Sequence, residues 1–222
     1  MLRTTGMDEE TSEALRRKMV DRQIRARGVR DPRVLDALLW VPRHEFVPAA
    51  LEEEAYEDTP LGIGEGQTIS QPYIVAFMTE LACLNPDSKV LEVGTGCGYQ
   101  TAILSALARE VFSIEIIESL GLGAKEKLER ARFSNVHIRI GDGYQGWPEE
   151  APFDAILVTA APVRVPQPLL NQLKIGGRLV IPIGDFYQDL AVFTKTEQGV
   201  QEEKMIPVRF VPMTGLAARP TG

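Results

Sequence analysis

The chain has 222 residues and a formal net charge of −7 at pH 7, with 44% hydrophobic and 25% charged residues. This balance is typical of one α/β domain with additions, and its acidity argues against a nucleic-acid or anionic-membrane partner. Two cysteines are too few for a disulfide framework and no apolar run reaches the roughly 18 residues of a membrane span, so we expect a cytoplasmic protein.

The first seventy residues predict a helical extension followed by a long loop. Apolar residues at helical spacing predict a helix from Thr11 to Gly28, and Asp31-Pro32 predicts the start of a second helix. The segment from about residue 48 to residue 70 is expected to be irregular, and a loop of that length is usually functional or mobile. The residues before Thr11 are expected to be disordered.

From Gln71 onward the sequence alternates between helical and strand patterns. Helices are predicted near 71–83, 98–108, 118–131, 143–150 and 166–173. Strands are predicted at Lys89–Val93, Val111–Glu115, Val136–Ile140, Asp154–Thr159 and Arg178–Pro182, followed by Leu190–Thr196 and Met205–Val211, which are joined by a polar turn.

This order predicts an α/β fold of the doubly wound, Rossmann-like kind. We expect a mostly parallel sheet of about seven strands, with helices on both faces and an antiparallel C-terminal edge. The expected parts are an N-terminal extension with the loop, residues 1–70, and a main domain, residues 71–222, together forming one compact unit.

A glycine-rich turn follows the first strand of the alternating region. Gly94, Gly96 and Gly98 stand where open α/β sheets bind ligands, outside the carboxyl ends of their strands. A dinucleotide fingerprint needs a further glycine at the position of Tyr99, and no Gly-Lys-Ser/Thr follows for a Walker-type loop. The turn therefore indicates neither of these phosphate sites, and on its own it is also compatible with a tight turn that binds nothing.

Acidic residues stand at the ends of three consecutive predicted strands. They are Glu92 before the turn, Glu115 about 20 residues later, and Asp142 next to Gly143. Each alone can be a surface acid, but together they lie at one edge of the sheet. This set resembles the class I S-adenosylmethionine methyltransferases. The resemblance implies that the three glycines flank the methionine part of that cofactor, with Glu92 in the same site, that Glu115 holds the ribose, and that Asp142 with Gly143 contacts the adenine.

Other chemistries find little support in the sequence. The segment Thr159–Pro162, after the fourth strand, lacks the Asp/Asn-Pro-Pro-aromatic motif of many enzymes that methylate base or amide nitrogen. Cys97 is interpreted as a small residue that fills the turn. His44 and His137 have no triad-like neighbours, and no metal site is expected.

The segment Gly66–Pro72 joins the long loop to the helix that precedes the cofactor strand. Ser70 is predicted to be the N-cap of that helix, with Pro72 in its first turn. Free N–H groups at a helix N-terminus attract a carboxylate, and a hydroxyl there can orient one. The structural and functional interpretations of Ser70 are compatible.

Over about residues 15–215 the chain resembles the protein-L-isoaspartate (D-aspartate) O-methyltransferase family. The matching segments are Val41–Arg43, Phe46–Pro48, Tyr56, Gly66–Pro72, Leu91–Gly98, Gly141–Gly143, Ala151–Val158 and Leu173–Gly184. The resemblance implies methyl transfer from S-adenosylmethionine, giving S-adenosylhomocysteine, to the free carboxylate of L-isoaspartyl and D-aspartyl residues in damaged proteins and peptides. It assigns Ser70 to catalysis and Thr68, Ile69, Ser70 and Thr214 to the border of the cofactor. Val75 departs from relatives that carry histidine there, and the chain differs beyond Thr214.

The implied reaction agrees with the lack of acid–base machinery. An isoaspartyl carboxylate has a pKa well below 7, so it is already a nucleophile at neutral pH. A monomer is expected. Two alternatives to this function remain open. A class I methyltransferase for a small-molecule oxygen or carbon would share the cofactor site but leave the Gly66–Pro72 loop unexplained. A non-catalytic nucleotide-binding protein would leave both the acids and the loop unexplained.

Overall fold

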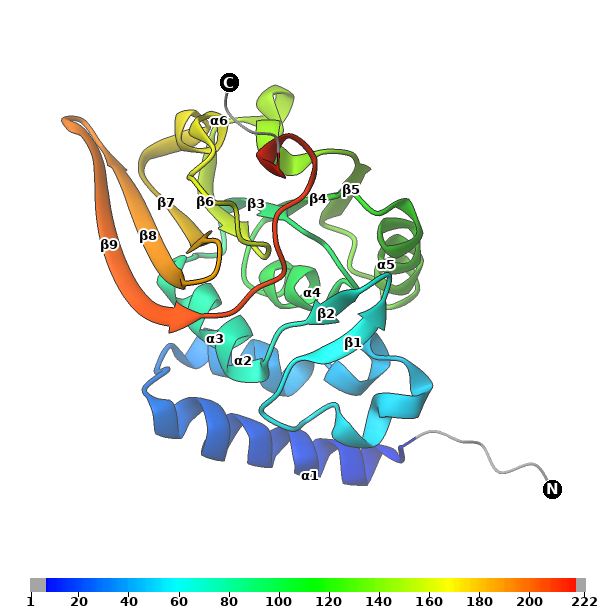
Figure 1. Cartoon of the computed structure of the whole chain (residues 1–222). Coiled ribbons are helices and arrows are strands. Elements are labelled where there is room, and N and C mark those ends of the chain that lie inside the picture. The colour runs from blue at the N-terminus through cyan, green and yellow to red at the C-terminus, as the bar shows by residue number, and fades with distance from the viewer. Residues whose placement is uncertain (1–6, 219–222) are drawn as a thin grey trace.

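The computed structural model describes residues 7–218 and contains six α-helices and nine strands in that range (Figure 1). The helices are α1 (Glu9–Met19), α2 (Pro32–Trp40), α3 (Pro72–Leu81), α4 (Tyr99–Ser105), α5 (Glu118–Arg130) and α6 (Gln167–Asn171). The strands are β1 (Leu61–Gly64), β2 (Gln67–Ile69), β3 (Lys89–Val93), β4 (Glu110–Glu115), β5 (Val136–Ile140), β6 (Phe153–Val158), β7 (Leu173–Gly184), β8 (Gln188–Thr196) and β9 (Gly199–Val208).

Seven strands form one sheet in the order β5-β4-β3-β6-β7-β8-β9. The first five are parallel to one another, whereas β8 is antiparallel to β7 and β9 is antiparallel to β8. The chain runs outward from β3 to β5 and then returns to place β6 on the other side of β3. The predicted doubly wound sheet with an antiparallel edge is thus confirmed, and its switch point lies between the carboxyl ends of β3 and β6.

Alternate residues of the central strands belong to two hydrophobic clusters, one on each face of the sheet. Val90 and Val111 pack with residues of α3 and α4, such as Met78 and Leu104. Their chain neighbours Leu91 and Phe112 pack on the opposite face with Ile156 of β6 and Leu169 of α6. This two-residue period is what a sheet covered on both faces requires.

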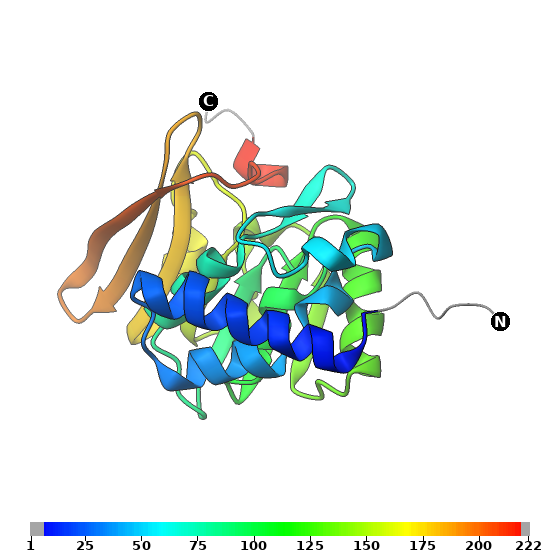
Figure 2. The same cartoon turned by 90° about the horizontal axis from the view of Figure 1, so that it is seen from below.

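The N-terminal helices form a further layer on the α3 and α4 side (Figures 1 and 2). Helix α1 continues through a π-helical turn and a 3-10 turn to Gly28, whose φ of +100° is a left-handed conformation that ends the helix. Met19 and Leu38 of this layer share one hydrophobic cluster with Ala76 and Ile103, so the apolar packing crosses the predicted boundary between residues 70 and 71. Within residues 7–218, no helix is both long and apolar enough to cross a bilayer.

Three sequence-based expectations about local structure are wrong. The segment 48–70 is not irregular throughout, because it contains a 3-10 helix at Ala49–Glu54 and the antiparallel hairpin of β1 and β2. The predicted helix over 143–150 is two short 3-10 turns. Helix α1 already begins at Glu9, with Asp8 as its N-cap, so the expected disorder does not include the residues just before Thr11. Residues 1–6 lie outside the described part of the chain.

Candidate active site

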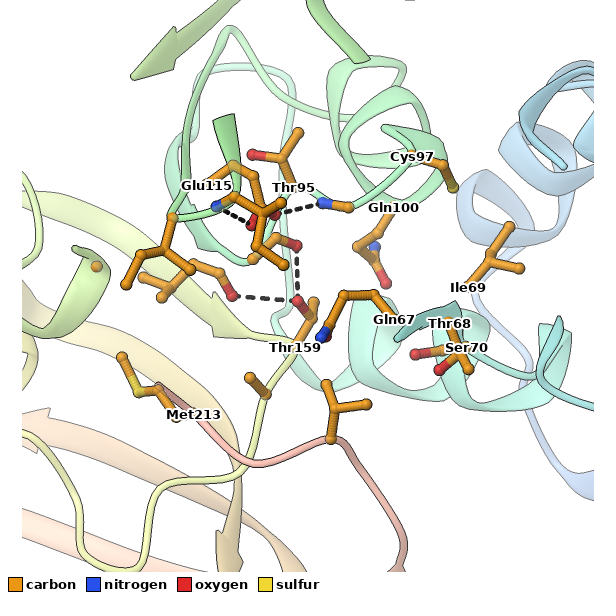
Figure 3. A pocket seen from close by; sticks show the side chains of 18 of the residues that line it. Gln67, Thr68, Ile69, Ser70, Thr95, Cys97, Gln100, Glu115, Thr159 and Met213 are labelled. Carbon is orange, nitrogen blue, oxygen red and sulfur yellow. Dashed lines mark hydrogen bonds between the residues drawn. The ribbon is translucent and has the colours of Figure 1, made fainter. Parts of the chain in front are cut away.

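A pocket of about 950 Å³, including its open mouth, lies at the switch point of the sheet. Segments that are far apart in the sequence line it: Ile63 with Gln67–Ser70, Val75 with Met78, Val93–Cys97 with Tyr99 and Gln100, Ile114–Ile117, Asp142–Gly143, Thr159–Ala160 and Val211–Thr214. In Figure 3, Thr95 and Glu115 stand on one side of this space and Thr68 and Ser70 on another. The pocket is thus formed where the β1–β2 hairpin and the C-terminal segment approach the carboxyl edge of the sheet.

The glycine turn after β3 passes so close to its neighbours that side chains are excluded. Gly94 has a φ of +99°, and a Cβ atom there would overlap Oγ1 of Thr159. The Thr159 hydroxyl donates to the carbonyl of Gly94 at 2.6 Å, which fixes this turn to the end of β6. Gly94 therefore leaves its backbone open toward the pocket, as the spacing of the glycines predicts.

Glu115 ends β4 and anchors the same turn from the other side. Its residue surface is only 5% exposed, and Oε2 accepts a hydrogen bond from the N–H of Gly96 at 2.8 Å. Oε1 accepts one from the N–H of Ile117 at 2.9 Å. Each carboxylate oxygen has further acceptor capacity, and Glu115 lines the pocket, so the side chain can also accept hydrogen bonds from ligand hydroxyls.

Asp142 joins the pocket to the C-terminal segment. Oδ1 accepts a hydrogen bond from the N–H of Tyr144 at 2.9 Å, and Oδ2 accepts one from the N–H of Leu216 at 2.7 Å. Next to it, a Cβ at Gly143 would overlap Val93. Thr214 lies in the pocket lining, and backbone hydrogen bonds between Ala161 and the chain at 211–213 hold this segment in place.

A fully buried arginine holds the loop that carries Ser70. Nε of Arg43 donates to the carbonyl of Ala55 at 2.7 Å, and a terminal nitrogen donates to the carbonyl of Ser70 at 2.8 Å. The guanidinium lies 5.0 Å from the ring centre of Tyr99, which is a cation–π arrangement. Burial lowers the pKa of Arg43, and no salt-bridge partner is found for it in the described range.

The predicted N-cap role of Ser70 is wrong. Helix α3 begins at Pro72, its N-cap is Gln71, and no side chain bonds to the first turn. The side-chain amide of Gln71 instead donates to the carbonyl of Asp58 at 3.0 Å. Among residues 7–218 the hydroxyl of Ser70 has no hydrogen-bond partner, although Ser70 lines the pocket with Thr68 and Ile69. The Ser70 hydroxyl is therefore free for a ligand.

Two of the predicted cofactor residues do not line the pocket. Glu92 is completely buried behind the turn, where Oε2 accepts hydrogen bonds from the hydroxyls of Thr101 at 2.5 Å and Ser113 at 2.6 Å. Gly98 is the left-handed N-cap of α4 and faces Leu128 of α5. Neither residue is placed to contact a ligand in this pocket. Both instead support the glycine turn from behind.

Several residues that line the pocket were not singled out from the sequence as ligand contacts. They include Gln67, Thr95, Gln100, Thr159 and Met213. Thr159 had a usable signal, because it directly follows β6, beside the switch point. His44, which bonds to the hydroxyl of Tyr56 at 2.7 Å, and His137, which stacks on Phe112, lie outside the pocket lining. No cluster of three or more potential metal ligands occurs among the residues that the structure describes.

Comparisons with known proteins agree with this architecture. The model of the protein-L-isoaspartate(D-aspartate) O-methyltransferase family matches residues 14–218. The chain belongs to this family. A family relative from Picosynechococcus sp., named protein-L-isoaspartate O-methyltransferase, is 61% identical over 202 residues, which are 91% of this chain and 91% of that protein. One of the same name from Gloeobacter violaceus is 54% identical over 198 residues, 88% of this chain and 97% of that protein.

A solved structure of the family has the same overall fold. It is a candidate protein-L-isoaspartate O-methyltransferase from Plasmodium falciparum, in complex with S-adenosyl-L-homocysteine. The comparison has a TM-score of 0.78 at 28% identity and covers 91% of this chain and 98% of that chain. The resemblance stated from the sequence is therefore confirmed as family membership, and the enzyme is an O-methyltransferase.

The buried carboxyl of Glu92, behind the glycine turn, predicts that the stability of the protein depends on pH. Burial raises the pKa of Glu92 from 4.5 to about 8, although the hydroxyls of Ser113 and Thr101 lower it. The folded chain thus keeps a proton that the unfolded chain loses, and stability falls as the pH rises from about 4.5 to about 8. Glu92→Gln, which mimics the protonated form, should gain on the order of a few kcal/mol over the native chain between pH 5 and pH 8.

Urea unfolding of both proteins at pH 5, 6.5 and 8 measures this difference. Glu126→Gln, which removes an exposed carboxyl on α5, is the control and should leave the pH profile unchanged. Parallel profiles for Glu92→Gln and the native chain would contradict a protonated Glu92.

Proposed function

We propose that the chain transfers a methyl group from S-adenosylmethionine to the free carboxylate of L-isoaspartyl, and also D-aspartyl, residues in damaged proteins and peptides. The observation that carries this proposal is the unpartnered hydroxyl of Ser70. It lines the pocket that the glycine turn and Glu115 line on another side (Figure 3). Family membership supports the reaction, and the relative from Plasmodium falciparum, in complex with the demethylated product, supports the methyl donor.

The residues of the pocket fit this methyl donor. Glu115 can accept hydrogen bonds from ribose hydroxyls, while the glycine turn, where Gly94 has no room for a Cβ, allows close approach of the methionine part. Asp142 and Gly143 line the part of the pocket where we place the adenine. Thr68, Ile69, Ser70 and Thr214 complete the border of the site. Glu92 and Gly98 act by supporting the turn rather than by contact.

The lining of the pocket suits the reaction of an anion with a cation. When bound, S-adenosylmethionine supplies an electrophilic methyl group on a positively charged sulfur. Charge diminishes in the transition state, so a cationic clamp on the carboxylate would favour the ground state and slow the reaction. No lysine, arginine or histidine occurs in the pocket lining within residues 7–218. Ser70 can orient the carboxylate through a neutral hydroxyl, without removing its charge.

Positioning then supplies most of the acceleration. Holding two reactants in line can contribute roughly 7–11 kcal/mol relative to free encounter. The acceptor carboxylate needs no general base, because its pKa lies well below 7. The methyl ester would cyclise without the enzyme to a succinimide that reopens partly to normal aspartate, which is the repair role that the family implies.

A pair of peptides tests the proposed function. The two peptides differ only in carrying isoaspartate or aspartate at one position, and transfer of labelled methyl from S-adenosylmethionine is measured for each. We expect labelling of the isoaspartyl peptide alone. Equal labelling of both peptides, or labelling of neither, would contradict the proposed acceptor.

Removing the hydroxyl of Ser70 should slow methylation without weakening the fold. A single hydrogen bond of about 0.5–1.5 kcal/mol corresponds to a loss of roughly 2- to 12-fold in kcat for Ser70→Ala. Loss of a helix cap would instead cost about 1 kcal/mol of stability, and Ser70 caps no helix. Steady-state kinetics and urea unfolding separate the two effects, with Ser134→Ala as an exposed control. Full turnover together with reduced stability would restore the structural interpretation.

The remaining expectations concern the setting of the enzyme. We propose a cytoplasmic monomer that binds no nucleic acid and no membrane. The net charge of −7 supports the last two points, and the free thiols of Cys83 and Cys97 fit a reducing compartment. Sedimentation of the full chain in the presence and absence of nucleic acid tests the monomeric state and the lack of nucleic-acid binding together.

A further inference from the structure

Two aromatic residues stand almost fully exposed in the tight turn between β7 and β8. Phe186 is 93% exposed and Tyr187 is 95% exposed, more than any other large hydrophobic residue in the described part of the chain. Aromatic side chains of this size normally contribute to cores and interfaces, because they carry a large apolar surface. Two such neighbours in solvent indicate a contact surface for a partner.

Side-chain and backbone hydrogen bonds attach this turn to the wall of the pocket. Gln188, the first residue of β8, accepts a hydrogen bond from the N–H of Phe210 at 2.6 Å and donates to the carbonyl of Phe210 at 3.2 Å. Val211, the residue after Phe210, lines the pocket. On the other side, the N–H of Gly184 donates to the carbonyl of Pro162 at 3.0 Å, in the segment that follows Thr159 and Ala160.

The turn is also built to be tight. Gly184 has a φ of +132°, and a Cβ there would overlap the carbonyl of Tyr187. The side-chain amide of Gln188 donates in addition to the carbonyl of Asp185 at 3.3 Å. The backbone below the two aromatic residues is therefore fixed from both ends. A fixed surface loses little conformational entropy when a partner binds to it.

We propose that Phe186 and Tyr187 bind the polypeptide that flanks the residue being methylated, and that they favour apolar side chains in that flank. This inference rests on the proposed function. A polypeptide acceptor must extend out of the pocket, and the aromatic turn adjoins the pocket wall at Val211. The connection from that wall to the turn is short, since Phe210 precedes Val211 in the chain and bonds to Gln188, the residue after Tyr187.

Two isoaspartyl nonapeptides with identical centres test this proposal. One has leucine, valine and tyrosine in its flanks, and the other has glycine and serine. We expect the native enzyme to prefer the apolar peptide by about tenfold in kcat/KM, since a central aromatic contact is of that order. The double variant Phe186→Ser/Tyr187→Ser should reduce the preference to within about twofold, with binding of S-adenosylhomocysteine unchanged.

A matched control lies on β7, at the end of the strand away from the aromatic turn. Ile175→Ser removes a hydrophobic side chain that is 66% exposed at the start of β7, and it should keep the full preference. A native enzyme without preference, or a double variant that keeps it, would overturn the proposal. So would a native dimer that the double variant dissociates, because the turn would then serve self-association. Methylation of the glycine–serine peptide by the double variant shows that the proposed function survives either result.

Discussion

Replacing Glu115 by alanine is expected to weaken the binding of S-adenosylhomocysteine by about 10²- to 10³-fold. The carboxylate accepts the N–H groups of Gly96 and Ile117, and we place both ribose hydroxyls on its remaining acceptor positions. A hydrogen bond to a charged group contributes about 1.5–3 kcal/mol, so the loss of two at the lower value, about 3 kcal/mol, already corresponds to roughly 10²-fold. The released N–H of Gly96 also frees the glycine turn, which adds to the loss.

Calorimetric titration with S-adenosylhomocysteine measures the effect directly. Glu115→Gln keeps the size and one acceptor oxygen, and should bind about tenfold more weakly than the native chain. Glu118→Ala removes an exposed carboxyl three residues further along, at the start of α5, and should bind within about twofold of the native chain. An affinity of Glu115→Ala within twofold of the native chain would contradict the ribose assignment.

The parts of the fold that the sequence predicted are those with strong local periodicity. The central strands are apolar on both faces, and Asn85-Pro86 and the glycines mark where the neighbouring helices stop and start. Seven strands in one sheet and the antiparallel edge followed from this pattern. The hairpin of β1 and β2 did not, because strands of four and three residues with glycines at 62, 64 and 66 carry no period that distinguishes them from a loop.

The site was predictable where residue type and strand position coincide. Glu115 is the last residue of β4 and Asp142 follows β5, and both line the pocket as the topology requires. Glu92 is the second-last residue of β3. Because side chains alternate between the two faces of the sheet, the Glu92 side chain lies behind the glycine turn, next to Thr101 and Ser113. Which face of the sheet a strand residue occupies is set by long-range packing, here against α4, which carries Thr101.

The cap of α3 shows a second limit of local patterns. The motif Ser70-Gln71-Pro72 is typical of an N-cap two residues before proline, yet the helix begins one residue later than this pattern suggests. The competing interaction is the buried guanidinium of Arg43, which takes the carbonyl of Ser70. The sequence offers no sign of it, since an arginine 27 positions earlier would ordinarily be assigned to the surface.

Replacing Arg43 by methionine should therefore change both the stability and the activity. Methionine fills part of the space but leaves the carbonyls of Ala55 and Ser70 without donors, at about 1–3 kcal/mol each. Removing a buried cation offsets part of this cost, so we expect the free energy of unfolding to fall by about 2–4 kcal/mol. The loop that carries Ser70 loses its anchor, and kcat should fall about tenfold or more even where the variant is fully folded.

A comparison of kcat with the affinity for S-adenosylhomocysteine distinguishes a misplaced loop from general instability. The loss in kcat should exceed the loss in affinity for S-adenosylhomocysteine, because the side-chain hydrogen bonds of Arg43 go to Ala55 and Ser70 and not to Glu115 or the glycine turn. Arg43→Lys keeps the charge, but a single ammonium lacks the planar fork that reaches two carbonyls, so its kcat should be intermediate. Arg22→Met, an exposed substitution in the N-terminal layer, should change neither quantity. A folded Arg43→Met enzyme with native kcat would show that Ser70 holds its place without the buried arginine.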